Sequence, residues 1–462
     1  MHGDYTGRIT RMRQILAVPL RLCSVPFLVL GFAAAASAPA FAGQTAAAPT
    51  ALSAEIDRLA TAVEPQLLAW RRHLHEHPEL SNREVETSKY VAEQLRKLGL
   101  EPQTGIARHG VVAILKGALP GPVVALRADM DGLPVREETD VPFASKAIGE
   151  YQGNKVGVMH ACGHDTHMAM LLAAAKVLTE MRDGLPGTVK FIFQPAEEGA
   201  PEGEDPAGAN AMVKAGVMTN PKVDAVFGLH VFSNIPTGHI TYRSGPFMAA
   251  SDRLEIVVKG RQTHGATPWR GIDPIVVGSQ IVMALQTIVS RGVDITTVPA
   301  IVTIGQFQSG VRNNIIPDSA TLVGTIRTFD DRMQDEIHAQ VTRIADGIAA
   351  SAGTTAQVTI RRQYPVTVND PALTARMLPT LERVAPGAVK QSEIITASED
   401  FSYYQREAPG VYLFLGVTPA AQVGKAGQNH SPLFVVDEKA LPTGVRALVN
   451  LTVDYMLGAT AR

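Results

Sequence analysis

The chain contains very little cysteine and few aromatic residues for its length. Two cysteines occur among its 462 residues, and Phe, Trp and Tyr together make up 5%. Cys23 lies in an apolar N-terminal run and would leave with that run if it is a cleaved leader. Cys162 would then be the only cysteine of the mature protein, which excludes an intramolecular disulfide. Cys162 therefore needs another explanation.

An excess of one charge is also missing. The chain has 42 Lys and Arg against 44 Asp and Glu, a formal net charge of −2. Without a long basic run, nothing in the charge pattern predicts binding to nucleic acid. We therefore expect a small-molecule substrate. With 45% hydrophobic residues, the chain is long enough to form two domains with buried cores.

We expect no apolar run long enough to remain in a membrane. The apolar run at residues 22–36 is shorter than the roughly twenty residues that span a bilayer, and no comparable segment is expected after it. Four arginines lie before or at its start, and Ala-Phe-Ala at 40–42 offers a cleavage site between small residues. We predict a signal peptide over residues 1–42 and a periplasmic or secreted protein, with an uncleaved anchor as the alternative.

The segment after the leader has the pattern of an α/β domain. Helical spacing covers residues 52–98, with Pro78 separating two helices. Asp165 is placed to cap a helix that runs to about residue 182. Short runs that are apolar on both faces, as in buried parallel strands, occupy residues 123–128, 189–193 and 223–229.

The pattern changes near residue 245. Up to residue 360 the predicted order is strand, helix, strand, strand, helix, strand, which is that of a ferredoxin-like domain. Later elements, including a helix at 437–457, can complete the first sheet. We therefore predict a mixed, largely parallel-sheet catalytic domain (43–245 plus 361–462) with an inserted ferredoxin-like α+β lid or dimerisation domain (246–360).

Metal-binding side chains follow the predicted strands where these end. Ligands in an open α/β sheet gather outside the carboxyl ends of its strands, and imidazole, thiolate and carboxylate all suit zinc-like ions. Each such residue alone is more often an ordinary core or loop residue, but their common position favours a hydrolytic metal centre. They are Asp129, Asp131, Glu197, Glu198, His230 and the loop residues His160, Cys162, His164 and Asp165.

Three N-terminal histidines are assigned differently. His73, His75 and His77 have a spacing that invites a metal site, but they lie at a polar helix end before Pro78. We do not expect them to bind metal.

A series of motifs covers the chain from about residue 60 to its C-terminus. They are RHLHEHPEL (72–80), LRADMDGLP (126–134), MHACGHDTH (159–167), FIFQPAEEG (191–199), GLH (228–230), GIDPI (271–275), NIIPD (314–318), EDF (399–401) and HSP (430–432). In this order they resemble the hippurate hydrolase and auxin-conjugate (IAA-amino acid) hydrolase branch of the two-metal aminoacylase and carboxypeptidase superfamily.

The resemblance implies a metal-dependent amidohydrolase that cleaves the amide bond of N-acyl or N-aroyl amino acids. It implies that two divalent ions (Zn, Mn, Co or Ni) are held, that Glu197 is the general base and that Asp131 orients a ligand histidine. The implied metal ligands are Cys162, His164, Glu198, His230 and His430.

The resemblance also assigns residues of the lid. It implies that His264 stabilises the oxyanion, from the same or a neighbouring subunit, and that Asn314 and Arg327 bind the substrate carboxylate. A surface role for Arg327 stays open, as does a homodimer formed through the lid.

The sequence departs from the family pattern at two places. Trp269 stands where many members have histidine, and the segment 200–209 (APEGEDPAGA) is more acidic than in cytosolic members. We expect this segment to border the site and, with Trp269, to favour apolar or aromatic acyl groups over acyl-Asp and acyl-Glu.

Three other functions are weighed against this one. A dipeptidase or carboxypeptidase could use the same metal centre. An amidase could instead use Cys162 as nucleophile and His164 as its base. A binding protein without catalysis is disfavoured by Glu197, whose expected task is proton transfer.

Overall fold

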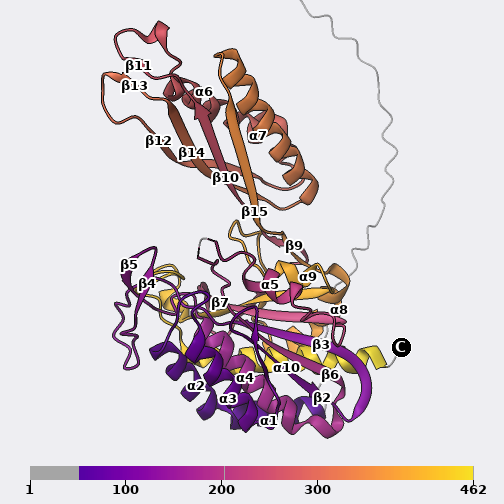
Figure 1. Cartoon of the computed structure of the whole chain (residues 1–462). Coiled ribbons are helices and arrows are strands. Elements are labelled where there is room, and N and C mark those ends of the chain that lie inside the picture. Colours follow the sequence, from indigo (N-terminus) through magenta and orange to yellow (C-terminus); the bar gives the residue numbers. More distant parts are fainter. Residues whose placement is uncertain (1–50, 202, 461–462) are drawn as a thin grey trace, which may run out of the picture. The chain divides into compact units, whose positions relative to one another are not determined.

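The computed structural model describes residues 51–201 and 203–460, so the predicted signal peptide lies outside the described residues. An eight-stranded mixed sheet forms the framework of the larger domain (Figure 1). Its strands β6, β3, β7 and β18 are parallel to one another, while β2 and β8 run antiparallel to their neighbours β6 and β18. In spatial order the strands are β1 (Gln103–Ile106), β2 (Gly110–Lys116), β6 (Pro186–Gln194), β3 (Leu119–Asp129), β7 (Ala225–Pro236), β18 (Gly410–Thr418), β8 (Ile240–Tyr242) and β17 (Val389–Gln391).

Helices cover both faces of this sheet. One hydrophobic core lies between the sheet and the helices α1 (Ala51–Ala62), α2 (Glu64–Glu76), α3 (Val85–Lys97), α4 (His164–Glu180), α8 (Pro371–Val384) and α10 (Leu441–Thr460). A second core, on the other face, includes residues of the short helices α5 (Gly208–Lys214) and α9 (Ser402–Gln405). The central strands are therefore buried on both faces, as their apolar sequences predict.

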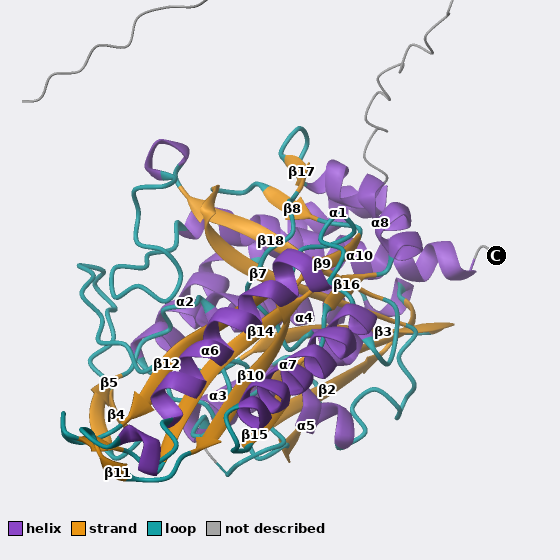
Figure 2. Cartoon of the chain, turned by 90° about the horizontal axis from the view of Figure 1, so that it is seen from above, coloured by secondary structure: helices purple, strands orange, loops and turns teal. Residues whose placement is uncertain are grey.

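The lid has a sheet and a core of its own. Its strands lie in the order β12 (Ile301–Ser309), β14 (Ser319–Thr328), β10 (Ala250–Lys259) and β15 (Ala356–Tyr364), all antiparallel, as the ferredoxin-like pattern requires. Helices α6 (Pro274–Thr287) and α7 (Asp331–Ser351) cover one face of this sheet (Figure 2). The two-domain α/β fold that we expected is confirmed, and β15 continues past the expected boundary at residue 360.

Short pairs of strands complete the structure. Strands β4 (Ile148–Tyr151) and β5 (Asn154–Gly157) form a hairpin, and β11 (Thr263–His264) pairs with β13 (Ile315–Ile316) in the lid. Strand β9 (Gly245–Met248), before the lid, pairs with β16 (Thr367–Asn369) after it. The two chain segments that connect the lid therefore lie side by side.

Three local predictions were wrong. Residues 51–97 form three helices, because the chain starts a new helix at Glu64, with Pro65 at its N-terminal turn. Asp165 does not cap α4; Gly163 precedes the helix with φ +95°, and the Asp165 carboxylate is buried against Arg71 and His75. His230 does not follow β7 but lies inside it, because pairing with β18 prolongs the strand to Pro236.

One described helical segment is long and apolar enough to cross a membrane by length and composition, namely Pro274–Gly292, contrary to our expectation that no such segment follows the leader. It consists of α6 and the turn after it. Val277, Ile281 and Leu285 on one side of α6 are buried in the lid core. Packing on the lid sheet accounts for that face, and the other side of α6 exposes Ile275, Val276 and Met283 among polar residues.

Candidate active site

The candidate site lies where β3, β6 and β7 part from one another. The pairing of β3 with β7 ends at Arg127 and Gly228, and His230 lies two residues further along β7. β3 ends at Asp129 and β6 ends at Gln194, just before the turn that carries Glu197 and Glu198. This is the carboxyl edge at which the sequence predicts a site.

The five expected metal ligands converge on this edge. Two sets of ligand atoms each lie within 4.8 Å of one another, and Cys162 belongs to both, once with His164 and His230 and once with Glu198 and His430. The Cys162 Sγ lies 3.3 Å from His230 Nε2 and 3.2 Å from His430 Nε2, and His430 Nε2 lies 3.0 Å from Glu198 Oε1. The thiolate is therefore positioned to be shared between two ions.

Hydrogen bonds at Nδ1 direct the Nε2 atoms of His164 and His230 toward this cluster. His164 Nδ1 donates to the carbonyl oxygen of Asp131 at 2.8 Å, and His230 Nδ1 donates to that of Val231 at 2.7 Å. Each Nε2 then carries the lone pair that a metal requires. Within the described part of the chain, the Nε2 of His164 is buried without a hydrogen-bond partner, as expected of an atom that binds an ion.

The cluster carries an excess of negative charge that suits a cation. Burial, Glu198 and Glu197 raise the pKa of the Cys162 thiol well above its usual value, so it needs a bound cation to become a thiolate. Although burial opposes it, the carboxylates of Asp129 and Asp131 raise the pKa of His164 to about 10. Positive charge is therefore favoured here, and the donor set fits two divalent ions.

Asp131 holds the turn that carries both glutamates. Its Oδ1 accepts from the amide of Glu197 and its Oδ2 from the amide of Glu198, both at 3.0 Å. Ser81 Oγ donates to the same Oδ2 at 2.7 Å. Although burial opposes it, the hydrogen bond from His164 lowers the pKa of Asp131, which favours the ionised form that these donors require. Asp131 thus orients His164 and fixes the position of both glutamates.

Glu197 is in a different environment from its neighbour. One of its carboxylate oxygens lies within 4.8 Å of those of Glu399 and Asp400, and burial together with Glu399 raises its pKa well above the usual value. A carboxylate with a raised pKa can accept a proton and return it near neutral pH. Glu198 faces His430 instead.

The matching family model covers residues 125–454 and is described as peptidase family M20/M25/M40. The chain belongs to this family. It is 42% identical over 395 residues to thermostable carboxypeptidase 1 of Saccharolobus solfataricus, covering 85% of this chain and 96% of that one. It is 42% identical over 315 residues to the N-acyl-L-amino acid amidohydrolase of Geobacillus stearothermophilus, covering 68% and 81%.

A solved structure gives the same result. The Bacillus subtilis protein YxeP, described as a dinuclear metal binding peptidase of the M20 family, matches with a TM-score of 0.72 and 36% identity over 86% of this chain and 99% of that one. The resemblance inferred from the motifs is thereby confirmed, and the protein is a metal-dependent hydrolase of the M20/M25/M40 family.

Several buried residues around this M20/M25/M40 site were not assigned a role from the sequence. Arg127 is paired with Asp129 at 2.6 Å, Glu399 at 3.0 Å and Asp400 at 2.8 Å. His167 Nδ1 lies 2.6 Å from Asp129 Oδ1, and its Nε2 accepts from the amide of Val231, next to His230. The motifs contain Arg127, Asp129, His167, Glu399 and Asp400, but their spacing in sequence does not indicate these contacts.

The lid residues are not gathered in one place within a single chain. Asn314 precedes β14 and Arg327 lies at its far end, where its Nη1 donates to Ser398 Oγ at 2.8 Å. His264 and Asn314 are neighbours through the β11–β13 pair, and both are exposed. Among the described residues, no hydrogen bond or ion pair links these two to the catalytic domain. Their expected roles stay predictions.

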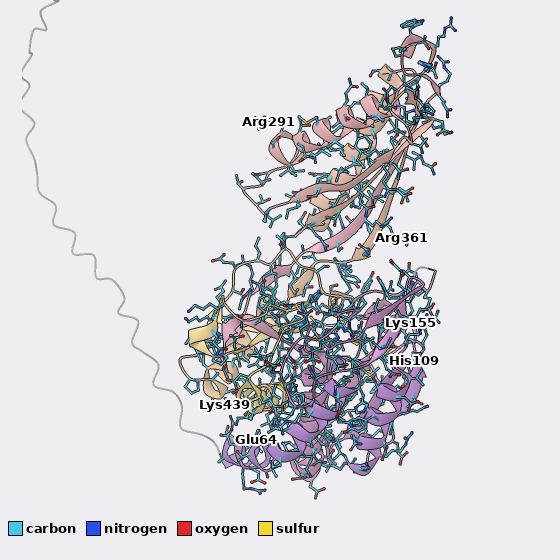
Figure 3. All side chains as sticks on the ribbon, turned by 90° about the vertical axis from the view of Figure 1, so that its left-hand side faces the viewer. Glu64, His109, Lys155, Arg291, Arg361 and Lys439 are labelled. Atoms are coloured by element: carbon cyan, nitrogen blue, oxygen red, sulfur yellow. The ribbon has the colours of Figure 1, made fainter. Side chains whose placement is uncertain are left out.

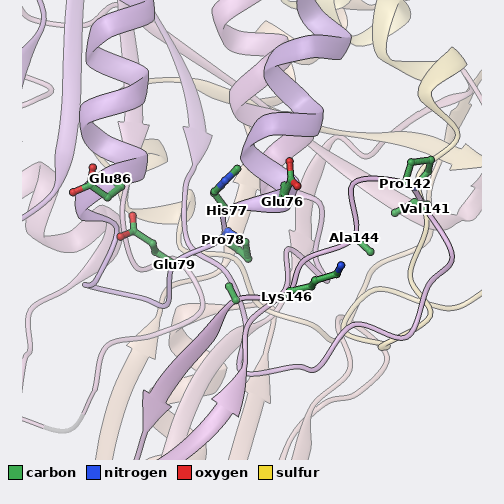
Figure 4. Close-up of a pocket in the computed structure, with 10 residues that line it drawn as sticks. Glu76, His77, Pro78, Glu79, Glu86, Val141, Pro142, Ala144 and Lys146 are labelled. Atoms are coloured by element: carbon green, nitrogen blue, oxygen red, sulfur yellow. The ribbon is translucent and has the colours of Figure 1, made fainter.

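The N-terminal histidines are not grouped as a metal site among the described residues. His75 lies between Asp165 at 3.0 Å and Glu137 at 3.1 Å, and His73 stacks on His77 and on Tyr90. Glu76, His77, Pro78 and Glu79 line a hollow together with residues of the segment 141–147 (Figure 4). None of the expected metal ligands lines this hollow.

The acidic segment 200–209 is less negative than its sequence suggests. Glu204 lies 2.8 Å from Arg83 and 3.8 Å from Arg108, and it accepts from Asn82 at 3.0 Å. Asp205 lies 3.5 Å from Arg361, which is labelled in Figure 3. These arginines compensate two of the three charges, and Glu202 lies outside the described residues. The expectation that this segment repels acidic substrates thus loses its main support.

Proposed function

We propose that the protein hydrolyses the amide bond of N-acyl or N-aroyl amino acids or similar small conjugates by a two-metal mechanism. The observation that carries this proposal is the convergence of His164, His230, Glu198 and His430 on Cys162, beside the carboxylate of Glu197, to which we assign the role of base and not of ligand. When bound there, two divalent ions lower the pKa of a water molecule and polarise the scissile carbonyl.

The protein groups perform the remaining steps. Glu197 takes a proton from the attacking water and passes it to the nitrogen of the leaving amino acid, while Asp131 keeps the Glu197 amide in place at 3.0 Å. His264 stabilises the negative charge that develops on the carbonyl oxygen, and Asn314 and Arg327 bind the carboxylate of the substrate.

A cysteine-nucleophile amidase is disfavoured by the surroundings of Cys162. A reactive cysteine needs neighbours that lower its pKa, whereas burial and two glutamates raise the pKa of Cys162. A carboxypeptidase or dipeptidase remains the rival within the same chemistry, and the carboxypeptidase name of the S. solfataricus relative favours testing it.

A substrate panel tests the proposed function. The purified enzyme is stripped with a chelator, reloaded with Zn, Mn, Co or Ni, and assayed on N-acetyl, N-benzoyl and long-chain N-acyl amino acids and on dipeptides. We expect activity to vanish without metal, to return with it, and to be highest on acyl amino acids. Faster cleavage of dipeptides would favour the rival. Metal-independent turnover would contradict the proposal.

We further propose that apolar or aromatic acyl groups are preferred. Trp269, on the lid, is 76% exposed and offers an aromatic surface. The same panel tests this preference.

We also propose that the protein is a homodimer that pairs through the lid. Val276 and Met283 on α6 are 54% and 73% exposed, and β12 beside this helix is an edge strand with Phe307 39% exposed. An apolar helix face next to an open sheet edge fits a second copy of itself, because both can be covered by one two-fold contact.

We also propose that the protein is exported. A leader cleaved after Ala42 would leave a periplasmic or secreted enzyme whose mature chain begins near Gly43. N-terminal sequencing of protein from the outer compartment tests this, and recovery of the full-length chain in the membrane fraction would contradict it.

A further inference from the structure

The turn that carries the general base has an unusual backbone. Ala196 has φ +53°, a left-handed conformation that is uncommon for a residue with a side chain, and Gly199 has φ +101°. Such a turn persists only when its surroundings hold it. Two carboxylates hold the amide groups of this turn. Glu84 accepts from the amide of Ala196, and Asp131 accepts from the amides of Glu197 and Glu198.

A further contact to this turn comes from the end of the lid. The hydroxyl of Tyr364 donates to the backbone carbonyl of Glu197 at 2.6 Å. Among the described residues, Tyr364 is the only hydrogen-bond donor to that carbonyl. The peptide unit between Glu197 and Glu198 is therefore held at both ends, at its amide by Asp131 and at its carbonyl oxygen by the hydroxyl of Tyr364.

An irregularity in the lid sheet sets the position of Tyr364. Arg362 pairs with Asp252 and Tyr364 with Ser251, so Gln363 is an extra residue on β15. An extra residue of this kind changes the face toward which the next side chain points, and it is common beside active sites. Tyr364 is also the last residue of β15, the strand by which the chain leaves the lid (Figure 1).

We propose that Tyr364 is a positioning residue that links the lid's return strand to the general base, by holding the carbonyl of Glu197. Because its hydroxyl belongs to the last residue of a lid strand, a rotation at this point of the chain would move the donor and reorient the Glu197 peptide group. The inference rests on the proposed role of Glu197. Under this proposal, the orientation of Glu197 depends on the conformation of the chain segment that leaves the lid at Tyr364.

The substitution Tyr364→Phe isolates this contact, since it removes the hydroxyl and keeps the ring. A net hydrogen bond of ordinary strength corresponds to a loss of about 5- to 10-fold. We expect kcat and kcat/KM to fall together by about this factor, with KM and metal content unchanged, because only the placement of the base is disturbed.

The chain offers a matched control at the same place. The hydroxyl of Tyr403 donates to the carbonyl of Gln363 at 2.7 Å, so Tyr403→Phe removes a hydrogen bond to the same strand end without a contact to Glu197. We expect this variant to retain wild-type kcat. An equal loss in both variants would show that loosening of the strand end is responsible, and it would overturn the proposal.

A double-mutant cycle separates this proposal from that of Glu197. In the Glu197→Gln background, Tyr364→Phe should have no further effect, since the residue acts through the base. An unchanged kcat for Tyr364→Phe, an equal loss in the Glu197→Gln background, or a variant that does not fold would each overturn the proposal and leave the role of Glu197 intact. Normal activity of the single variant Glu197→Gln would instead show that Glu197 is not the general base.

Discussion

At the scale of single residues, the adjacent glutamates should have separable roles. Glu197→Gln keeps the shape of the side chain but cannot take up a proton, and general acid/base catalysis typically contributes about 10² to 10⁴ in rate. We expect this variant to bind metal normally and to lose activity by about that factor. Glu198→Gln should lose metal, since Glu198 lies 3.0 Å from the His430 nitrogen at the centre of the cluster.

Metal content of the two purified variants, measured beside kcat, is the decisive comparison. If Glu197→Gln also loses its metal, Glu197 is a ligand. If Glu198→Gln keeps both ions, Glu198 is not one.

The sequence was informative about the ligands and much less so about the residues that hold them. The five expected ligands and Glu197 come from the motifs, and the fold brings them together. Tyr364 and Glu84 act through contacts with the turn at Ala196 and Glu197 from segments more than a hundred residues away. Neither contact leaves a local pattern, because it depends on an irregular turn and an extra residue in a strand.

At the scale of elements, the loop that leads into α3 contributes a buried acid to the site. Burial and the nearby Asp131 raise the pKa of Glu84 from its usual 4.5 to about 8, and its Oε1 accepts from the amide of Ala196 at 2.8 Å. Between these pH values the folded protein keeps a proton that the unfolded chain has released. The free energy of unfolding therefore falls as the pH rises through this range and levels off above it.

Glu84→Gln should remove this pH dependence, because the amide keeps an acceptor oxygen but does not titrate. We expect its Tm to match the wild type near pH 5 and to exceed it near pH 9, in thermal unfolding of the metal-loaded enzyme. Glu86→Gln is the control, since the Glu86 side chain is 73% exposed and pairs only with Lys89. Parallel Tm profiles for wild type and Glu84→Gln would refute the assignment.

The sequence predicted the positions of helices and strands where its hydrophobic periodicity was strong. The buried strands β3, β6 and β7 and the lid order were predicted because continuous apolar runs and amphipathic helices leave a clear signal. The short pairs β4–β5 and β8–β17 were missed, since strands of three or four partly exposed residues carry no such signal. The helix start at His164 was misplaced, because Asp165 is used for a buried ion pair instead of a cap.

At the scale of the whole molecule, dimerisation through the lid should depend on the exposed side of α6. Met283→Glu places a charge on a side chain that is 73% exposed in the single chain, so it should leave the fold intact and break the contact. Light scattering should give twice the monomer mass for the wild type and the monomer mass for the variant. Leu119→Glu, at a residue 51% exposed on β3 of the catalytic domain, should stay dimeric. A monomeric wild type at micromolar concentration would contradict the proposal.

The proposed dimer also offers an explanation for the distribution of the lid residues. His264 and Asn314 are exposed and contact no residue of the catalytic domain by a hydrogen bond or ion pair within the described chain.

If the partner's lid supplies His264, then Glu197→Gln and His264→Ala subunits are each inactive as homodimers. A mixed dimer joins the intact Glu197 of one subunit to the intact His264 of the other and so contains one complete site. Random mixing makes half of the dimers mixed, so unfolding and refolding the two variants together should restore about a quarter of wild-type activity. Mixing Glu197→Gln with Cys162→Ala should restore none, because both substitutions then damage the same kind of metal centre. If the His264 mixture also stays inactive while mixed dimers form, His264 acts within its own chain.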